Sequence, residues 1–272
     1  MNFKKITESV SNYDCLENMT INELTKNINK EDKSVANAVN KELKYINKLI
    51  SKVIFQLRSG GRLFYIGSGT SGRLGIVDAS ECPPTFGVSH KLVIGIIAGG
   101  DEAIRKSVEK AEDNMEQGWF DLKKFDITNK DFVVGITASG TTPYVLGALT
   151  NCIKNKIPTG CITCNPNSPV ALNCDFPIQI IVGPEFITGS SRMKAGTAQK
   201  MVLNMITTTT MIGLGKILGN KMVDMQLSNE KLIKRGTNMI VEQLGLEKAK
   251  ALKLLKKHKS VREAINQYRN ES

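Results

Sequence analysis

The chain has 272 residues, enough for one large domain or for one domain with a small appendage. Hydrophobic residues make up 41% and charged residues 23% of it, which excludes a disordered or collagen-like protein. Lys and Arg number 37 against 26 Asp and Glu, and the resulting charge of +11 favours an anionic partner: nucleic acid, anionic lipid or a phosphorylated small molecule.

The sequence predicts a cytoplasmic protein without a membrane partner. Residues 1–5 lead into polar sequence and lack the apolar core of a secretory signal. The longest weakly apolar stretch, residues 201–218, is interrupted by Thr, Asn and Lys and falls short of the ~20 apolar residues that a membrane span needs. Six cysteines in a chain of this length do not indicate a disulfide scaffold.

The N-terminal part of the chain is predicted to be helical. Residues 1–33 are polar with scattered apolar positions, which indicates short helices on the outside of the fold. From Val35 to Leu57, apolar residues recur at spacings of three and four, which is the pattern of one helical face. Gly60 and Gly61 end that helix.

An alternation of strands and helices follows. Continuous apolar or β-rich runs predict five strands, at residues 62–66, 92–98, 132–137, 160–164 and 176–182. Helical patterns predict one helix from the first loop to Ser80, one over 101–117 and one from the second loop to about Lys154. Two more are predicted, from about Ser191 toward Leu218 and from Ser228-Asn229 onward. Interleaved elements of this kind predict an α/β fold with a parallel sheet covered on both faces.

The end of the chain differs in composition. Residues 243–272 hold eight Lys or Arg and three Glu, and their Leu and Ala spacing predicts a small C-terminal helical bundle. We therefore predict an N-terminal helical segment packing on the core (1–58), an α/β domain (59–222) and a C-terminal helical region (223–272). Tyr268 is the only aromatic residue of the basic tail, so we expect a solvated helical face rather than a nucleic-acid site.

The first candidate binding loop, Gly67–Gly72 (GSGTSG), follows a strand and opens a helix. It matches the dinucleotide fingerprint G-x-G-x-x-G. That fingerprint needs an acidic residue at the end of the next strand, and here Asp101 and Glu102 come later and start a helix, so a dinucleotide oxidoreductase ranks last. The hydroxyls of the loop suit a phosphate monoester at a helix N-terminus instead.

The second loop, Thr137–Thr142 (TASGTT), repeats this chemistry after a later strand. Either loop alone would be interpreted as a tight turn or a helix cap. Two such loops at the carboxyl edge of one parallel sheet converge on a crevice, so together they predict a phosphate site.

Two acidic residues are candidates for proton transfer. Glu81 precedes Pro83-Pro84, which we interpret as a rigid turn just after the helix. Glu112 lies in a charged stretch, where a solvated helix face is the stronger interpretation from the residues alone. Paired carboxylates suit enolisation or elimination beside a carbonyl.

The cysteines do not indicate a metal or redox centre. Cys161 and Cys164 form the only C-x-x-C pair, and the chain has two histidines. A zinc site lacks further ligands, and a redox pair should open a helix rather than end a strand. We interpret both cysteines as core residues and predict no metal.

Several blocks resemble one known family, N-acetylmuramic acid 6-phosphate etherase, over roughly residues 5–240. The blocks occur in the order of that family: YIGSGTSGRLG (65–75), DASECPPTFG (78–87), IAGG (97–100), AED (111–113), ASG (138–140), TPY (142–144), GPE (183–185), TGS (188–190) and RMKAGTAQK (192–200).

The resemblance implies a sugar isomerase (SIS) domain, a three-layer α/β sandwich with a five-stranded parallel sheet, in a homodimer. It implies cleavage of the D-lactyl ether of N-acetylmuramic acid 6-phosphate by water, giving N-acetylglucosamine 6-phosphate and D-lactate, in cell-wall sugar recycling. It also implies that no metal, nucleotide or other cofactor takes part.

Site residues follow from the same resemblance. The two catalytic glutamates of the family correspond to Glu81 and Glu112. The resemblance to SIS phosphate sites implies Ser71, Thr137, Ser139 and Thr142 as phosphate ligands. The composition of the two loops adds Ser68, Thr70, Gly140 and Thr141. Apart from the resemblance, Arg192 and Lys194 at the start of the long helix are candidates to meet the lactyl carboxylate, with a helix-capping or dimer-interface role equally open.

Our mechanistic hypothesis is elimination followed by hydration of the open-chain aldehyde. Glu112 removes the C2 proton, Glu81 protonates the departing lactyl oxygen, and water adds at C3; the two roles can be exchanged. A sugar-phosphate-binding regulator and a sugar-phosphate isomerase remain the alternatives. The chain departs from the family pattern at Thr141, where Arg is usual, at Ser191, where Thr is usual, and after Thr7-Glu8-Ser9, where an expected Arg is missing.

Overall fold

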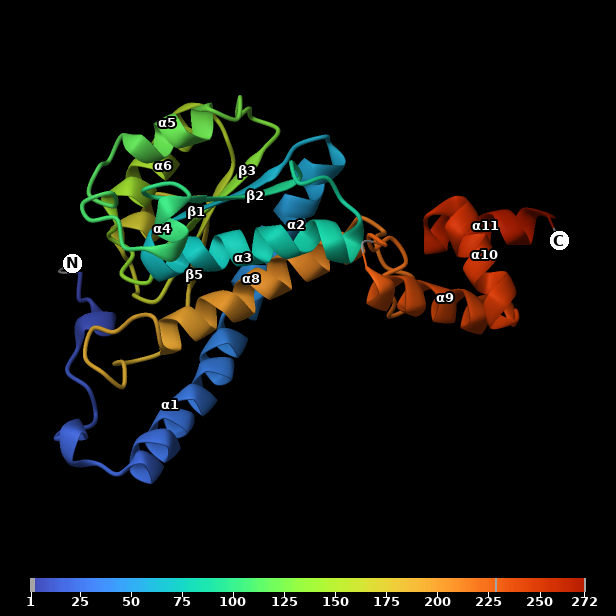
Figure 1. Cartoon of the computed structure of the whole chain (residues 1–272). Helices are drawn as coiled ribbons and strands as arrows, with labels where there is room; N and C mark the ends of the chain where they lie inside the picture. Colours follow the sequence, from blue (N-terminus) through green and yellow to red (C-terminus); the bar gives the residue numbers. More distant parts are fainter. Residues whose placement is uncertain (1–2, 228, 272) are drawn as a thin grey trace.

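A parallel sheet forms the centre of the protein (Figure 1). The computed structural model describes residues 3–227 and 229–271. Within them the sheet consists of β1 (Leu63–Gly67), β2 (Val93–Ile97), β3 (Phe132–Ile136), β4 (Thr159–Thr163) and β5 (Phe176–Gln179). The five predicted strands are confirmed, although β5 ends three residues earlier than expected.

The strand order is β2-β1-β3-β4-β5, and every neighbouring pair is parallel. The chain moves from β1 outward to β2, then returns to β3 on the other side of β1. The order therefore reverses between β1 and β3, where Gly67 pairs with Ile136. Ligands of parallel α/β sheets bind where the strand order reverses, outside the carboxyl ends of the strands.

Helices cover both faces of the sheet, as the alternation of buried side chains along each strand requires. Leu63 and Tyr65 pack toward α1 (Ile21–Lys41), α2 (Leu43–Arg58), α3 (Gly69–Phe86) and α8 (Lys194–Gly213). Phe64 and Ile66 pack toward α5 (Gln117–Lys123), α6 (Pro143–Lys154) and α7 (Pro169–Leu172). The three-layer α/β architecture is thereby confirmed.

The N-terminal helices differ from the prediction in their limits. Within residues 3–33, two short 3₁₀ helices, Ile6–Glu8 and Leu16–Asn18, precede α1, which already begins at Ile21. A capping box of Thr20 and Glu23 starts α1 at Ile21. The predicted helical face over 35–57 is divided between α1 and α2 at Glu42, whose carboxylate accepts a 3.2 Å hydrogen bond from the backbone N–H of Gln179.

The turn predicted at Pro83-Pro84 is wrong. Helix α3 continues past Ser80 to Phe86 and contains both prolines in its final turns, and Glu81 therefore lies on a helix. Each proline lacks the N–H that would bond the preceding turn and crowds the carbonyl four residues earlier, which weakens the helix just before its end. Gly87, with φ +65°, then closes the helix, its N–H bonding the carbonyl of Pro83.

The helix predicted over 101–117 is also wrong. Only α4 (Glu102–Arg105) forms, and Lys106 leaves it in an extended conformation. The Arg73 guanidinium accounts for part of this result, because it donates to the carbonyls of Ile104 and Lys106. The apolar residues that suggested a helix gain little burial, since Val108 and Met115 remain exposed.

A small helical bundle follows α8 at the C-terminal end. It contains α9 (Glu230–Leu244), α10 (Lys248–His258) and α11 (Val261–Glu271), which share a core of their own and stand beyond the ends of α3 and α8 in Figure 1. Asn229 caps α9, whereas Ser228, the other residue of the predicted start, lies outside the described residues. No helix in residues 3–227 and 229–271 has both the length and the apolar character that a membrane crossing requires.

Candidate functional site

The loops after β1 and β3 lie side by side, as the strand order requires, and a hollow of about 390 Å³ opens between them. Residues of the first loop, residues of the second loop and the acidic pair Glu112-Asp113 line it. Seven of the eight predicted phosphate ligands lie on its wall: Ser68, Thr70, Ser71, Thr137, Ser139, Thr141 and Thr142. Gly140 lies in the second loop between them.

The first loop presents backbone donors to the hollow. Ser68 precedes α3, and the N–H of Gly72 is the first to bond back into the helix, reaching the Ser68 carbonyl at 3.0 Å. The N–H groups of Gly69, Thr70 and Ser71 therefore have no acceptor within the helix. Free N–H groups at a helix N-terminus bind anions such as phosphate.

Ser71 has a second role in this loop. Its hydroxyl is buried and donates a 2.9 Å hydrogen bond to Gln199 of α8. This bond ties the first turn of α3 to the helix layer. The side chain thus fixes the loop, and its backbone N–H remains the group available to an anion.

The second loop gathers four hydroxyls. The Thr137 hydroxyl oxygen lies 2.8 Å from that of Thr142 and 3.3 Å from that of Ser139, and Thr141 donates to Ser139 at 3.1 Å. Gly140 makes the turn with φ +71°, and its N–H donates to Thr137. Since each hydroxyl can rotate its proton, this cluster can donate several hydrogen bonds to one phosphate group.

Glu112 lies next to both loops. Its carboxylate accepts a 2.6 Å hydrogen bond from the Ser68 hydroxyl, and its carbonyl accepts from the N–H of Tyr144 at the start of α6. The side chain is exposed, at the edge of the hollow. The structure therefore brings one of the two predicted glutamates to the predicted phosphate loops.

Glu81 does not join this group within one chain. It is exposed on α3, 13 residues beyond Ser68. At 1.5 Å per residue, the helix separates the two Cα atoms by roughly 20 Å. One chain alone therefore cannot bring Glu81 and Glu112 to the same carbon atom.

Arg192 and Lys194 are not among the described residues that line the hollow. Lys194 is buried, and its ammonium pairs with Glu31 of α1. Burial raises the pKa of Glu31, but the hydrogen bond and charge of Lys194 outweigh this and hold the pKa below its ordinary value. Arg192 is exposed. Lys194 thus joins α1 to α8, and its ammonium already has a carboxylate partner.

The start of α8 is fixed by a buried acid. The Glu185 carboxylate accepts hydrogen bonds from the backbone N–H groups of Lys194, at 2.8 Å, and Ala195, at 2.9 Å. Burial raises the pKa of Glu185, and these two donors oppose the rise. The GPE block therefore caps a helix that supports the site.

Sequence reasoning missed part of the wall. Lys5, Glu8 and Ser191 also line the hollow, and buried Asn165 lies behind the second loop. The Thr7-Glu8 pair carried a signal, as the remnant of an N-terminal motif, but nothing in its spacing placed it beside the phosphate loops.

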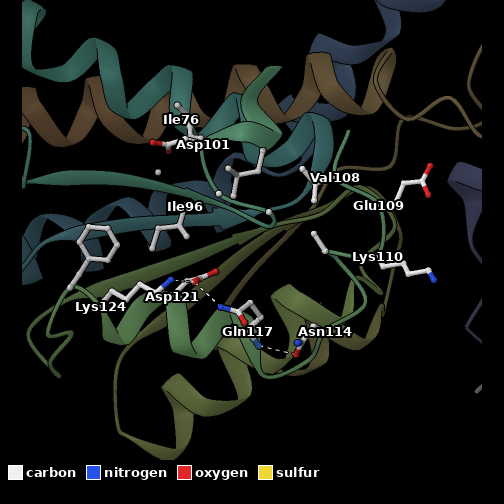
Figure 2. Close-up of a pocket in the computed structure, with 16 residues that line it drawn as sticks. Ile76, Ile96, Asp101, Val108, Glu109, Lys110, Asn114, Gln117, Asp121 and Lys124 are labelled. Atoms are coloured by element: carbon white, nitrogen blue, oxygen red, sulfur yellow. Dashed lines mark hydrogen bonds and ion pairs between the residues drawn. The ribbon is translucent and has the colours of Figure 1, made fainter. Parts of the chain in front are cut away.

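A larger hollow, of about 690 Å³, lies along the β2 edge of the sheet. Figure 2 shows Ile96, Val108 and Asn114 among the residues that line it, and the hydrogen bonds from Gln117 and Lys124 to Asp121. Burial raises the pKa of Asp121, but hydrogen bonds from Lys124, Tyr144 and Gln117 outweigh it and lower the pKa. This carboxylate is therefore engaged in fixing α5 to α6.

The cysteines are unpaired. Cys161 and Cys164 are fully buried, and the Sγ of Cys174, not of Cys164, lies 3.3 Å from that of Cys161. Within the described ranges, no cluster of three or more His, Cys, Asp or Glu side chains is arranged to hold a metal ion.

Comparison with known proteins defines first the class of fold. Residues 45–153 match the glucokinase regulatory protein N-terminal SIS domain, and residues 116–209 match the SIS domain. A phosphoheptose isomerase from Francisella tularensis superposes with a TM-score of 0.54 over 71% of this chain and 98% of that chain, at 14% identity. The protein has a SIS fold.

Full-length relatives then define the family. An N-acetylmuramic acid 6-phosphate etherase of Christiangramia forsetii is 60% identical over 97% of this chain and 97% of its own length. One of Bacteroides fragilis is 58% identical over 98% of this chain and 95% of its own. The chain belongs to the N-acetylmuramic acid 6-phosphate etherase family.

Proposed function

We propose that the protein binds N-acetylmuramic acid 6-phosphate and cleaves its D-lactyl ether, releasing D-lactate and N-acetylglucosamine 6-phosphate. Membership of the etherase family supports this substrate. The observation that carries the proposal is the hollow in which two hydroxyl-rich loops flank the carboxylate of Glu112. A 6-phosphate held there places the sugar ring carbons beside a group able to move protons.

The chemistry needs one base and one acid. Once the ring opens, the C1 aldehyde acidifies the C2 proton, and Glu112 removes it. The bond between C3 and the lactyl oxygen breaks as Glu81 protonates that oxygen, leaving an α,β-unsaturated aldehyde and D-lactate. Water then adds at C3 and a proton returns to C2, so the net change is the addition of one water across the ether bond.

The separation of the two glutamates supports a homodimer with shared sites. Since α3 holds Glu81 roughly 20 Å from Ser68 in the same chain, we infer that Glu81 of a second copy completes the site containing Glu112. Its exposed position on α3 leaves it accessible to another subunit.

Mixed subunits test this arrangement. Glu81→Gln and Glu112→Gln should each lower turnover by roughly 10²- to 10⁴-fold. After unfolding and refolding together, two inactive variants that share sites should recover about a quarter of wild-type activity, because half of the random dimers contain one intact site. Refolding each variant alone is the control. Activity no higher in the mixture than in the separate variants would overturn the shared site.

Product analysis tests the reaction itself. Incubation with N-acetylmuramic acid 6-phosphate should yield equimolar D-lactate and N-acetylglucosamine 6-phosphate. An isomerised sugar phosphate without lactate would indicate an isomerase. Saturable binding without any product would indicate a regulator, and either result would overturn the proposed activity.

A cytoplasmic location is part of the same proposal. The six cysteines are free thiols, which fits a reducing compartment.

A further inference from the structure

A short N-terminal arm, residues 3–11, lies against the second phosphate loop. Its anchor is Asn165, which is fully buried. The Asn165 side-chain oxygen accepts from the backbone N–H groups of Ile6 and Thr7, and its amide nitrogen donates to the Thr7 hydroxyl at 2.9 Å. The arm is thereby fixed by its backbone, independently of the side chain at position 5.

The same amide also holds the loop. Its nitrogen lies 3.1 Å from the carbonyl of Ala138 and 3.0 Å from that of Ser139. One buried side chain therefore joins residues 6 and 7 directly to the hydroxyl loop, although 158 positions separate Thr7 from Asn165.

The far end of the arm is held separately. The Ser11 N–H donates to the Thr188 hydroxyl at 2.9 Å, and the Ser11 hydroxyl donates to the carbonyl of Phe186 at 2.8 Å. The Tyr13 and Phe186 rings pack with their centroids 4.9 Å apart. With both ends attached, the arm forms a fixed wall of the hollow.

The N-terminal arm contributes a positive charge, that of Lys5, to a hollow whose other charged lining residues are acidic. Among the described residues that line it, Glu8, Glu112 and Asp113 carry carboxylates, and Lys5 is the only cation. No carboxylate in the described part of the chain forms an ion pair with Lys5, whose side chain is exposed. A cation beside a phosphate dianion offsets the repulsion between the phosphate and these three carboxylates.

We propose that the Lys5 ammonium binds the phosphate group of the substrate. Asn165 positions Lys5 for this role by holding the N-terminal arm beside the second loop. The inference rests on the proposed function for the identity of the sugar phosphate. The phosphate, rather than the lactyl carboxylate, is its partner because the residues next to Lys5 are tied to Ala138 and Ser139. The side chain thus joins Thr137, Ser139 and Thr142 around one anion.

Binding of the product tests the proposal without requiring turnover. The affinity for N-acetylglucosamine 6-phosphate, which carries the phosphate and no lactyl group, is measured by calorimetry for the wild type, Lys5→Met and Lys5→Arg. We expect Lys5→Met to bind roughly 10- to 100-fold more weakly, the usual effect of losing a hydrogen bond between charged groups, and Lys5→Arg to retain part of the affinity.

Lys4→Met is the matched control. Lys4 is the exposed neighbour of Lys5 and does not line the hollow. Wild-type affinity in Lys5→Met, or an equal loss in Lys4→Met, would overturn the proposal. So would an unchanged product affinity combined with a raised KM for N-acetylmuramic acid 6-phosphate, because that result assigns Lys5 to the lactyl carboxylate.

Failure of the proposed activity gives a different pattern. Suppose that the wild type releases no lactate, and that Lys5→Met but not Lys4→Met weakens product binding. The role of Lys5 in phosphate binding would then stand, and the etherase activity would be refuted.

Discussion

The hydroxyl of Ser68 donates a 2.6 Å hydrogen bond to the carboxylate of Glu112, joining two segments that lie 44 residues apart. The hydroxyl-rich loop predicts Ser68 among the phosphate ligands, and in this structure the Ser68 hydroxyl also holds the carboxylate of Glu112. Hydrogen bonds to charged groups are short and strong. The contact therefore couples the phosphate loop to the group proposed to move the C2 proton.

Removing this hydroxyl should impair turnover more than binding. We expect Ser68→Ala to lower kcat by roughly 10- to 100-fold, because Glu112 loses a charge-assisted hydrogen bond. KM should change little, since the phosphate keeps the backbone N–H groups of Gly69, Thr70 and Ser71. Steady-state D-lactate release measures both quantities.

Ser80→Ala is the control for Ser68→Ala. Ser80 lies on α3, the helix that follows Ser68; its side chain is exposed and its hydroxyl donates to the carbonyl of Val77 in the same helix. It should behave as wild type. A rise in KM with unchanged kcat in Ser68→Ala would assign the Ser68 hydroxyl to the phosphate rather than to Glu112.

The hydroxyl cluster should show the opposite pattern. Thr142→Val keeps the shape of the side chain and removes a hydroxyl that lies 2.8 Å from that of Thr137. We expect the KM for the sugar phosphate to rise roughly 10-fold, the effect of about one hydrogen bond, with kcat within a few-fold of wild type. Initial rates over a range of substrate concentrations decide this. A lowered kcat at constant KM would show that Thr142 does not act in binding.

Asn165→Ala should release the N-terminal arm. It leaves the N–H groups of Ile6 and Thr7 without their acceptor and costs about 2 kcal/mol of stability. Faster amide hydrogen exchange at residues 5–9, together with a KM raised as in Lys5→Met, is the expected result. Asn173→Ala, which removes an exposed bond to the carbonyl of Pro169, should change neither. Unchanged exchange in Asn165→Ala would contradict the role of the anchor.

The Arg62–Asp131 pair predicts how stability depends on pH. Asp131 Oδ1 accepts from the Arg62 N–H and Nε, and Oδ2 accepts from Arg62 Nη2 and the Thr128 N–H. Burial raises the pKa of Asp131, but these donors outweigh it and hold the pKa below its ordinary value. A lowered pKa stabilises the fold above the unfolded-state pKa of about 3.9, and this contribution is lost as pH falls through the folded-state pKa.

Asp131→Asn should therefore destabilise the protein by about 2 kcal/mol at pH 7, less than a fully buried pair would cost because Arg62 is partly exposed. The difference from wild type should be constant above about pH 5 and shrink below about pH 4. Urea unfolding at pH 7 and pH 3 measures it. A difference equally large at both values would show that the charge of Asp131 does not stabilise the fold.

The sheet could be predicted from the sequence because burial on both faces leaves a direct pattern. Strands β1 and β3 are entirely buried, and continuous apolar runs of this length are typical of strands covered on both faces. The adjacency of the two phosphate loops followed from parallel topology together with their hydroxyl-rich composition. These features depend on local sequence and on general rules of chain connection.

The failures occurred where distant contacts decide the local structure. Residues 106–116 have a helical apolar spacing, but Arg73 bonds the carbonyls at the end of α4, and Val108 and Met115 remain exposed. Pro83 and Pro84 suggested a turn, yet they fit the end of a helix closed by Gly87. Neither outcome can be inferred from residue type and spacing.

The candidate site shows the same division. Glu112 is assigned by resemblance, since its charged surroundings indicate only a solvated surface. Lys5 could not be predicted because its position depends on Asn165, an ordinary residue after β4 with no pattern around it. The separation of Glu81 from Glu112 could not be predicted because it depends on α3 continuing past Glu81, whereas the Pro-Pro interpretation ended this helix at Ser80.

The most direct test of the central claim is the position of the oxygen added during cleavage. The protein is incubated with N-acetylmuramic acid 6-phosphate in ¹⁸O-water, and both products are analysed by mass spectrometry. Elimination and hydration predict one ¹⁸O at C3 of N-acetylglucosamine 6-phosphate and unlabelled hydroxyl oxygen in D-lactate, with both products greatly reduced in Glu81→Gln. Label in the lactate hydroxyl, or no lactate at all, would contradict the account.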